Sequence, residues 1–139
     1  MLKIPNDRGV FILEIMVQST DIDDQNHVNN IVYLRWVQEV AYAHWKTLGS
    51  KELLDRFNWV VLRHEIDYHS PAMLGDKVIA STWIDGPEGP RQRRYVSIKR
   101  VSDNKSLASA TTTWCLLDAQ SGRPKRVTEE ITSVFGLKN

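Results

Sequence analysis

The chain has 139 residues, enough for one compact domain with a sizeable core and too few for two. Its 18 lysine and arginine residues balance 17 aspartate and glutamate residues, so the net charge of +1 provides no field that would attract nucleic acid or a membrane. A single cysteine, Cys115, excludes an internal disulfide and a thiolate metal cage within one chain. No apolar run approaches the roughly 20 residues of a membrane span, and the N-terminus lacks a signal-peptide pattern. We therefore expect a single cytoplasmic domain over residues 1–139.

The first part of the chain predicts a strand, a polar loop and one long helix. Residues 11–18 are rich in isoleucine, valine, phenylalanine and methionine, which is typical of a strand. A polar loop follows at 19–29. From 30 to 48 apolar residues recur at helical spacing, and Gly49 is well placed to end the helix. Because more than half of its girth is apolar, we expect this helix to pack against a large sheet.

The rest of the chain predicts a short helical piece, four strands and a final amphipathic segment. Their predicted ranges are 51–57 for the helical piece, 58–69, 76–85, 93–102 and 107–118 for the strands, and 128–135 for the last segment. In the first of these strands a period of two predicts one covered face. The residues expected to share that face are Val60, Leu62, His64, Ile66 and Tyr68.

One strand, one long helix and then a run of antiparallel strands indicate an α+β fold. A five-stranded sheet can cover a single helix with one of its faces. Its two edge strands keep unpaired backbone groups. Proteins commonly cover such edges by oligomerising, through pairing of edge strands or contact between helices. We therefore expect an oligomer, either a homodimer or a homotetramer.

The polar loop gathers the residue types that hydrolytic or acyl-transfer chemistry uses. Asp23, near the helix start, can act as a nucleophile or as a general base toward water, and its alternative role is to form a turn. His27 can shuttle a proton or hold a water, or else fix the loop through backbone contacts. Asn29 and Asn30 are natural helix caps, and the backbone N–H groups that follow can polarise a substrate carbonyl.

Other polar residues have structural interpretations. Asp21 and Asp24 are expected to be solvated or to brace the loop. Glu39 is expected to be solvated or to pair with Arg35 four residues before it. His64 is expected to be a core histidine with its hydrogen bonds satisfied.

Two metal-binding interpretations fail on spacing. The segment from Asp21 begins like a calcium loop, but Asn26 stands where the turn needs glycine and Val32 where the last glutamate belongs. A zinc motif that starts at His64 has Tyr68 where its second histidine belongs. No glycine-rich phosphate loop is present either, so we expect no metal and no cofactor.

A basic cluster, Arg91-Gln-Arg-Arg94, follows a turn rich in glycine and proline. Most charge runs are solvated faces. Arginines at a strand start can, however, bind phosphates in a bidentate manner, which would suit a ligand with a phosphate-rich handle.

A spaced motif runs through the loop and the start of the helix. It reads Asp21-x-Asp23-x-x-x-His27-Val28-x-Asn30-x-x-Tyr33-x-x-Trp36, and a second patch reads Tyr68-x-Ser-Pro-Ala72-x-x-Gly-Asp76. Together they resemble the hot-dog-fold thioesterases of the 4-hydroxybenzoyl-CoA thioesterase type. The core His27-Val-Asn-Asn30 also resembles the acyl-ACP thioesterases.

The resemblance implies a hot-dog fold, in which a five-stranded antiparallel sheet wraps around one long central helix. It implies that Asp23 is the catalytic carboxylate and that a backbone N–H near Asn30 polarises the thioester carbonyl, with His27 in support. It also implies an active site between two subunits, with the CoA phosphates held by surface arginines. The substrate-binding positions that it suggests are Asn29, Tyr33, Arg93 and Arg94.

The leading hypothesis is therefore a thioester hydrolase that cleaves an acyl-CoA to a free acid and CoA. The alternatives are an acyl-ACP thioesterase, a hydratase or dehydratase of acyl thioesters on the same fold, and an acyl-thioester-binding module without turnover. The sequence leaves the acyl group and its carrier open.

Overall fold

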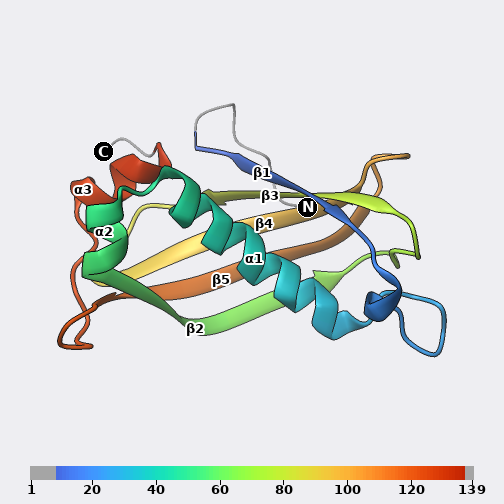
Figure 1. Ribbon diagram of the computed structural model, residues 1–139, viewed down its shortest axis with the longest axis horizontal. Coiled ribbons are helices and arrows are strands. Elements are labelled where there is room, and N and C mark those ends of the chain that lie inside the picture. Colours follow the sequence, from blue (N-terminus) through green and yellow to red (C-terminus); the bar gives the residue numbers. More distant parts are fainter. Residues whose placement is uncertain (1–8, 137–139) are drawn as a thin grey trace.

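The computed structural model describes residues 9–136. The chain forms a strand, a long helix, a short helix and then four strands, in the order that the sequence predicted (Figure 1). The elements are β1 (Phe11–Met16), η1 (Ser19–Asp21), α1 (Asn30–Leu48), α2 (Lys51–Arg56), β2 (Phe57–Tyr68), β3 (Lys77–Ile84), β4 (Arg91–Arg100), β5 (Ser106–Asp118), α3 (Glu129–Thr132) and η2 (Ser133–Phe135).

The five strands form one antiparallel sheet in the order β1-β3-β4-β5-β2. The predicted α+β architecture is confirmed, because α1 crosses one face of this sheet (Figure 1). The loop that precedes α1 lies at one end of the helix, while α2 and α3 gather at the other end. β1 and β2 are the two edges, and β2 is the longer of them.

Both ends of α1 are fixed by hydrogen bonds that the sequence supplies. Asn29 is the N-cap, since its side-chain oxygen accepts a hydrogen bond of 3.1 Å from the N–H of Ile31. At the other end the N–H of Gly49 donates to the carbonyl of Trp45 at 2.8 Å. A Cβ at position 49 would lie 2.7 Å from that carbonyl oxygen, so the close approach requires glycine.

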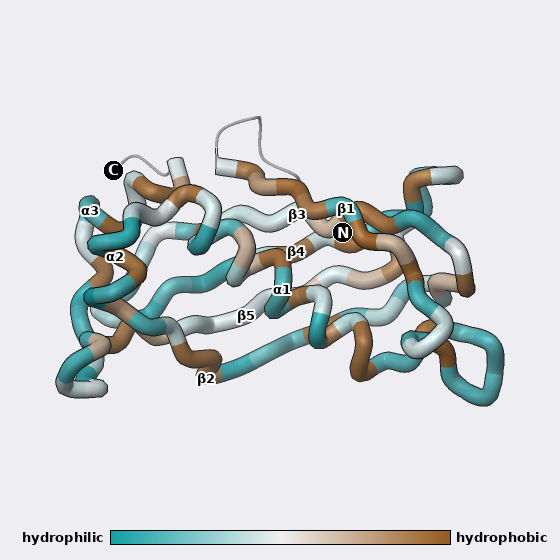
Figure 2. Tube along the Cα trace, in the orientation of Figure 1, coloured by the Kyte–Doolittle hydropathy of each residue, from teal (hydrophilic) through white to brown (hydrophobic). Residues whose placement is uncertain are grey.

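The core lies between α1 and the sheet in two clusters. Polar and apolar segments alternate along the trace of α1 in Figure 2, as expected for a helix with one face on a sheet. The first cluster surrounds the N-terminal part of the helix and includes Tyr33, Trp36, Val40, Ala80, Val96 and Ile98. The second surrounds its C-terminal part and includes Trp45, Leu53, Phe57, Leu116, Ile131 and Phe135.

A β-bulge at Leu62 changes which residues of β2 face the helix. The pairing of β2 with β5 shifts register there. Trp59 and Ile66 are an odd number of positions apart, yet both pack against the core. One extra residue inverts the alternation of side chains. The predicted face was therefore wrong for Val60 and Leu62, which are 39% and 50% exposed.

Candidate active site

The loop before α1 closes on itself through backbone hydrogen bonds. The N–H of Asp23 donates to the carbonyl of His27 at 2.8 Å, and the N–H of Asn26 donates to the carbonyl of Asp23 at 3.1 Å. Asn26 has a φ of 64°, a left-handed conformation that asparagine tolerates better than most residues. The turn therefore has a defined shape, and Asp23 and His27 lie side by side at its base.

The carboxylate of Asp23 is held by one of its two oxygens. Oδ1 accepts hydrogen bonds from the backbone N–H groups of Gln25 at 2.9 Å and of His27 at 3.3 Å. Oδ2 has no hydrogen-bond partner among residues 9–136. One oxygen thus orients the group, and the other is left for a water molecule or a substrate.

Asp21 fastens the loop to α1. Asp21 is only 2% exposed. Its carboxylate accepts hydrogen bonds from the guanidinium of Arg35 and from the N–H of Gln18, each at 2.8 Å. Arg35 also reaches Glu39 at 3.2 Å. The hydrogen bond to Asp21 raises the pKa of Arg35. Of the alternatives that the sequence left open, the structure shows Asp21 bracing the loop and Glu39 paired with Arg35.

The N-terminus of α1 offers a free backbone donor beside the loop. The N–H of Ile31 is occupied by the side chain of Asn29, and the N–H of Val32 donates to the carbonyl of Asn29 at 2.9 Å. The N–H of Asn30 has no acceptor among the described residues. At the positive end of a 19-residue helix, such a donor can stabilise a developing oxyanion.

These groups open into one cavity of about 490 Å³. Tyr33 is one of its lining residues, and its hydroxyl oxygen accepts the N–H of Ala72 at 2.8 Å. Burial raises the pKa of Tyr33. Tyr68 forms part of the wall, and its hydroxyl donates to the carbonyl of Asn30 at 3.3 Å. The full lining is Asp23, Gln25, His27, Val28, Asn29, Asn30, Tyr33, Tyr68, His69, Ser70 and Pro71.

The structure therefore brings together most of the residues that the sequence singled out. The wall contributed by residues 68–71 belongs to the second sequence patch, although no individual residue there was assigned to the site. His69 is the chemically notable addition, and its Nε2 lies 2.9 Å from the hydroxyl of Ser109. His69 stands at an unspecified position of the patch Tyr68 to Asp76, so no signal in the sequence pointed to it.

The two arginines expected to hold phosphates lie apart from this cavity and on opposite faces of β4. Arg93 is exposed on the outer face, near Asp85 and Glu88. Arg94 points inward and is only 4% exposed, because neighbouring strand residues face opposite sides. The expectation that Arg94 lies on the surface was therefore wrong.

Arg94 is held inside by neutral partners. Its Nη1 donates to His44 Nδ1 at 2.9 Å and to Thr82 Oγ1 at 3.0 Å. Burial, and then the charge of Arg94, lower the pKa of His44 to about 3, so that this imidazole is neutral. Burial also lowers the pKa of Arg94 to about 9, which leaves the guanidinium charged at neutral pH.

His64 has both ring nitrogens paired, as predicted. Gln38 Nε2 donates to His64 Nε2 at 3.1 Å, so Nδ1 is left to donate to Thr112 Oγ1 at 2.8 Å. Burial lowers the pKa of His64. The hydrogen bond between Gln38 and His64 links α1 to β2, and neither residue lines the cavity of Asp23.

The amino-acid sequence identifies the protein family. Residues 9–135 match the sequence model of the acyl-ACP thioesterase N-terminal domain. The chain belongs to the acyl-ACP thioesterase family. It is 22% identical over 138 residues to the chloroplastic palmitoyl-acyl carrier protein thioesterase of Arabidopsis thaliana, covering 93% of this chain and 34% of that protein. This acyl-ACP thioesterase family member thus spans about a third of the length of the curated relatives that it matches.

Solved structures with the same fold come from the hot-dog thioesterases. A thioesterase complexed with coenzyme A and Zn from Thermus thermophilus is 24% identical, with a TM-score of 0.78 and coverage of 94% of each chain. A 1,4-dihydroxy-2-naphthoyl-CoA thioesterase from Synechocystis is 17% identical, with a TM-score of 0.79 and coverage of 91% of this chain and 95% of that one. These similarities confirm the predicted hot-dog fold.

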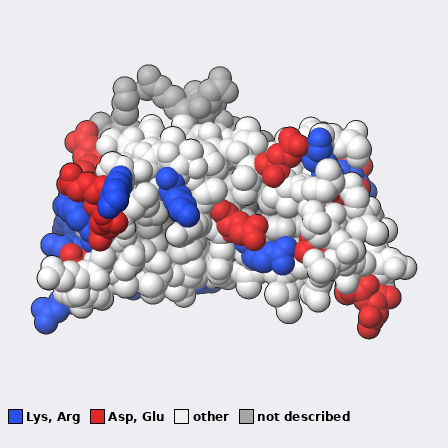
Figure 3. Space-filling model, viewed as in Figure 1, with Lys and Arg blue, Asp and Glu red and all other residues white. Residues whose placement is uncertain are grey.

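Three further observations concern the described part of this member of the acyl-ACP thioesterase family as a whole. Within residues 9–136, no helix combines the length and the apolarity that crossing a bilayer demands. In the same range no three histidine, cysteine, aspartate or glutamate side chains are grouped so that they could hold a metal ion. Charged side chains of both signs are scattered over the face drawn in Figure 3.

Proposed function

We propose that this chain hydrolyses an acyl thioester, and that its substrate is an acyl-CoA. One observation carries the proposal: Asp23, with one unpaired carboxylate oxygen, and Asn30, with an unpaired N–H, line the same cavity. Hydrolysis of a thioester needs a base or nucleophile on one side of the carbonyl carbon and a hydrogen-bond donor at its oxygen. The cavity offers one of each.

The chemistry follows from these two groups. The thioester carbonyl oxygen accepts the N–H of Asn30. Asp23 Oδ2 takes a proton from a water molecule, and the hydroxide adds to the carbonyl carbon. The tetrahedral intermediate then collapses, the carbon–sulfur bond breaks, and the proton passes to the departing thiolate. His27, next to Asp23 at the base of the turn, orients the water or the loop.

In the alternative route Asp23 Oδ2 attacks the carbonyl carbon itself, and the carbon–sulfur bond breaks as the thiolate departs. Water then hydrolyses the resulting mixed anhydride to the free acid and the Asp23 carboxylate, and its proton passes to the thiolate. The two routes differ in where oxygen from solvent appears. In ¹⁸O-labelled water, general-base catalysis by Asp23 places the label in the released acid in the first turnover and never in Asp23. The nucleophilic route, with water attacking Cγ of Asp23 in the anhydride, instead releases an unlabelled acid in the first turnover and leaves the label in the Asp23 carboxylate.

An acyl-ACP is the second candidate substrate, since the match to the acyl-ACP thioesterase family favours it. The same acyl group presented on CoA and on a carrier protein, with release of free thiol as the readout, separates the two. A panel of aromatic, short and long acyl groups then identifies the preferred one. Binding of acyl-CoA without thiol release would instead indicate a binding module, and hydration of an enoyl-CoA would indicate a hydratase.

We further propose that the functional unit is a homodimer formed through β2. This strand is an open edge of 12 residues, and an unpaired edge of that length tends to pair with another strand. The exposed apolar side chains Val60 and Leu62 lie on it.

A further inference from the structure

Arg100, the last residue of β4, joins separate parts of the chain with its guanidinium. Its Nε donates to Oδ2 of Asp76 at 2.9 Å, and its Nη1 donates to Oδ2 of Asp103 at 2.9 Å. Its Nη2 donates to the carbonyl of Pro71 at 2.7 Å. All three nitrogens are thus used, and the side chain is only 16% exposed. The connection between β2 and β3, which contains Pro71 and Asp76, is therefore fastened to the end of β4 and to the turn that follows it.

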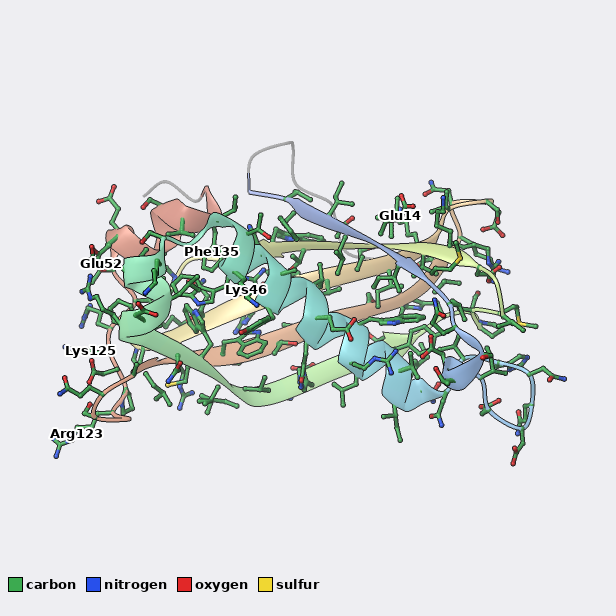
Figure 4. All side chains as sticks on the ribbon, viewed as in Figure 1. Glu14, Lys46, Glu52, Arg123, Lys125 and Phe135 are labelled. Carbon is green, nitrogen blue, oxygen red and sulfur yellow. The ribbon has the colours of Figure 1, made fainter. Side chains whose placement is uncertain are left out.

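The carboxylate of Asp76 also shapes the turn at the end of that connection. Its Oδ2 accepts the N–H of Met73 at 2.9 Å, and the N–H of Asp76 donates to the carbonyl of Met73 at 3.0 Å. Gly75 has a φ of 83°, a conformation that favours glycine. The next residue, Lys77, pairs at 3.2 Å with Glu14 of β1, which is labelled in Figure 4. These contacts give the glycine and the aspartate of the second sequence patch a structural role.

The carbonyl that Arg100 holds belongs to a wall of the candidate active site. Pro71 and its neighbour Ser70 both line the cavity of Asp23. The guanidinium lies behind this wall, because Arg100 itself is not among the residues that line the cavity. Its three hydrogen bonds therefore fix the position of the wall without contact with a ligand in the cavity.

Ala72 connects this wall to the loop before α1. Its carbonyl accepts the N–H of Val28 at 2.9 Å, and its N–H donates to the hydroxyl of Tyr33 at 2.8 Å. Val28 is buried and stands between His27 and Asn29, the residue that caps α1. A shift of Ala72 would therefore move the segment that joins the turn of the loop to the helix.

We propose that Arg100 is a positioning residue for the thioester reaction. Through the wall at residues 70–72 it sets the separation between the carboxylate of Asp23 and the N–H of Asn30. The inference rests on the proposed function, since it concerns the same cavity. A guanidinium donates to several acceptors in fixed directions, whereas a lysine ammonium is a compact point charge. Arg100→Lys therefore keeps the charge but cannot hold all three partners in place.

The kinetic test compares thiol release by Arg100→Lys and by Asp103→Asn. Arg100→Lys should lower kcat about tenfold and change KM less than about twofold, because misplaced reacting groups slow the chemical step more than they weaken binding. Asp103→Asn is the control, since it removes an exposed charge and leaves the hydrogen bonds to Asp76 and Pro71. Arg100→Gln is a second variant, with a loss of kcat at least as large. Unchanged kcat in the Arg100 variants, or an equal loss in Asp103→Asn, would overturn the proposal.

Hydrogen exchange measured by NMR provides a readout that needs no turnover. The N–H of Val28 should exchange at least about tenfold faster in Arg100→Lys than in the wild type, because its acceptor on Ala72 is less firmly held. The N–H of Gly49, at the other end of α1, should keep its rate. Unchanged exchange at Val28 would overturn the role of Arg100. Faster exchange in a chain that releases no thiol from any acyl-CoA would instead overturn the hydrolytic proposal and leave the positioning of the loop by Arg100 standing.

Discussion

Asp21 and Arg35 form an ion pair of 2.8 Å that joins the loop carrying Asp23 to the second turn of α1. The pair is asymmetric, since the carboxylate is 2% exposed and the guanidinium side chain is 51% exposed. Removing the arginine would therefore leave a buried carboxylate without its cation, whereas the reverse change would leave a cation that water can still solvate.

Arg35→Ala should lower the free energy of unfolding by about 2 kcal/mol, because the buried charge of Asp21 loses its partner. It should also lower kcat about tenfold through displacement of the loop, while KM changes less. Urea unfolding and thiol-release kinetics measure the two effects. Glu39→Gln is the control, since it leaves the Asp21–Arg35 contact intact. Equal losses in both variants would contradict a positioning role for the pair.

The cap of α1 should matter for turnover beyond its contribution to stability. Asn29→Ala removes the side-chain acceptor of Ile31 N–H and should cost about 1 kcal/mol. Ser50→Ala removes the corresponding cap of α2, where Ser50 accepts the N–H of Leu53 at 3.2 Å, at a similar cost. Only Asn29→Ala should also reduce thiol release, since it disturbs the donor at Asn30. A comparable loss of activity in Ser50→Ala would show that stability alone explains the effect.

The neutral state of His44 should make stability depend on pH. The pKa of His44 is about 3 in the folded chain against 6.5 for the free side chain, so between these values the unfolded chain binds a proton that the folded chain does not. The free energy of unfolding should therefore fall as the pH drops from about 6.5, by up to about 1.4 kcal/mol per pH unit from this residue.

His44→Gln keeps an acceptor for Arg94 and removes the titrating group, so it should flatten this slope. Urea unfolding at a series of pH values measures it, and the exposed His69 provides the matched control, His69→Gln. Parallel slopes in the wild type and in His44→Gln would show that His44 titrates normally in the folded chain.

The β2 edge should control the oligomeric state. Leu62→Lys places a charge on the edge where a second sheet would pair, and it should convert the dimer to a monomer in sedimentation velocity. Val101→Lys makes the same change at a residue that is 45% exposed at the turn between β4 and β5, and it should leave the dimer intact. A dimer that survives Leu62→Lys would exclude this interface.

The sequence could predict the candidate site because its chemistry is local. Asp23, His27 and Asn30 belong to one short segment, and the turn that unites them is held by bonds within that segment. The long helix and the strands were also predictable, since apolar periodicity follows directly from burial on one face. These features need no knowledge of distant contacts.

What the sequence could not predict depends on register across the sheet. The bulge at Leu62 results from the pairing of β2 with β5, and its extra residue reversed the expected face for Val60. The inward direction of Arg94 likewise depends on where β4 begins relative to its neighbours. Pro71, Asp76 and Asp103 come from two different connections between strands, so their meeting around Arg100 is visible only in the folded chain.

The hydrolytic proposal rests on Asp23, and a pair of matched substitutions tests it. Asp23→Asn keeps the shape of the side chain and removes its charge, whereas Asp24→Asn makes the same change at the exposed neighbouring position. The measurement is the rate of free-thiol release from the best acyl-CoA of the panel. We expect a fall of about 10²- to 10⁴-fold for Asp23→Asn with an unchanged melting temperature, and near-normal turnover for Asp24→Asn. Turnover close to wild type in Asp23→Asn would contradict the catalytic role of Asp23.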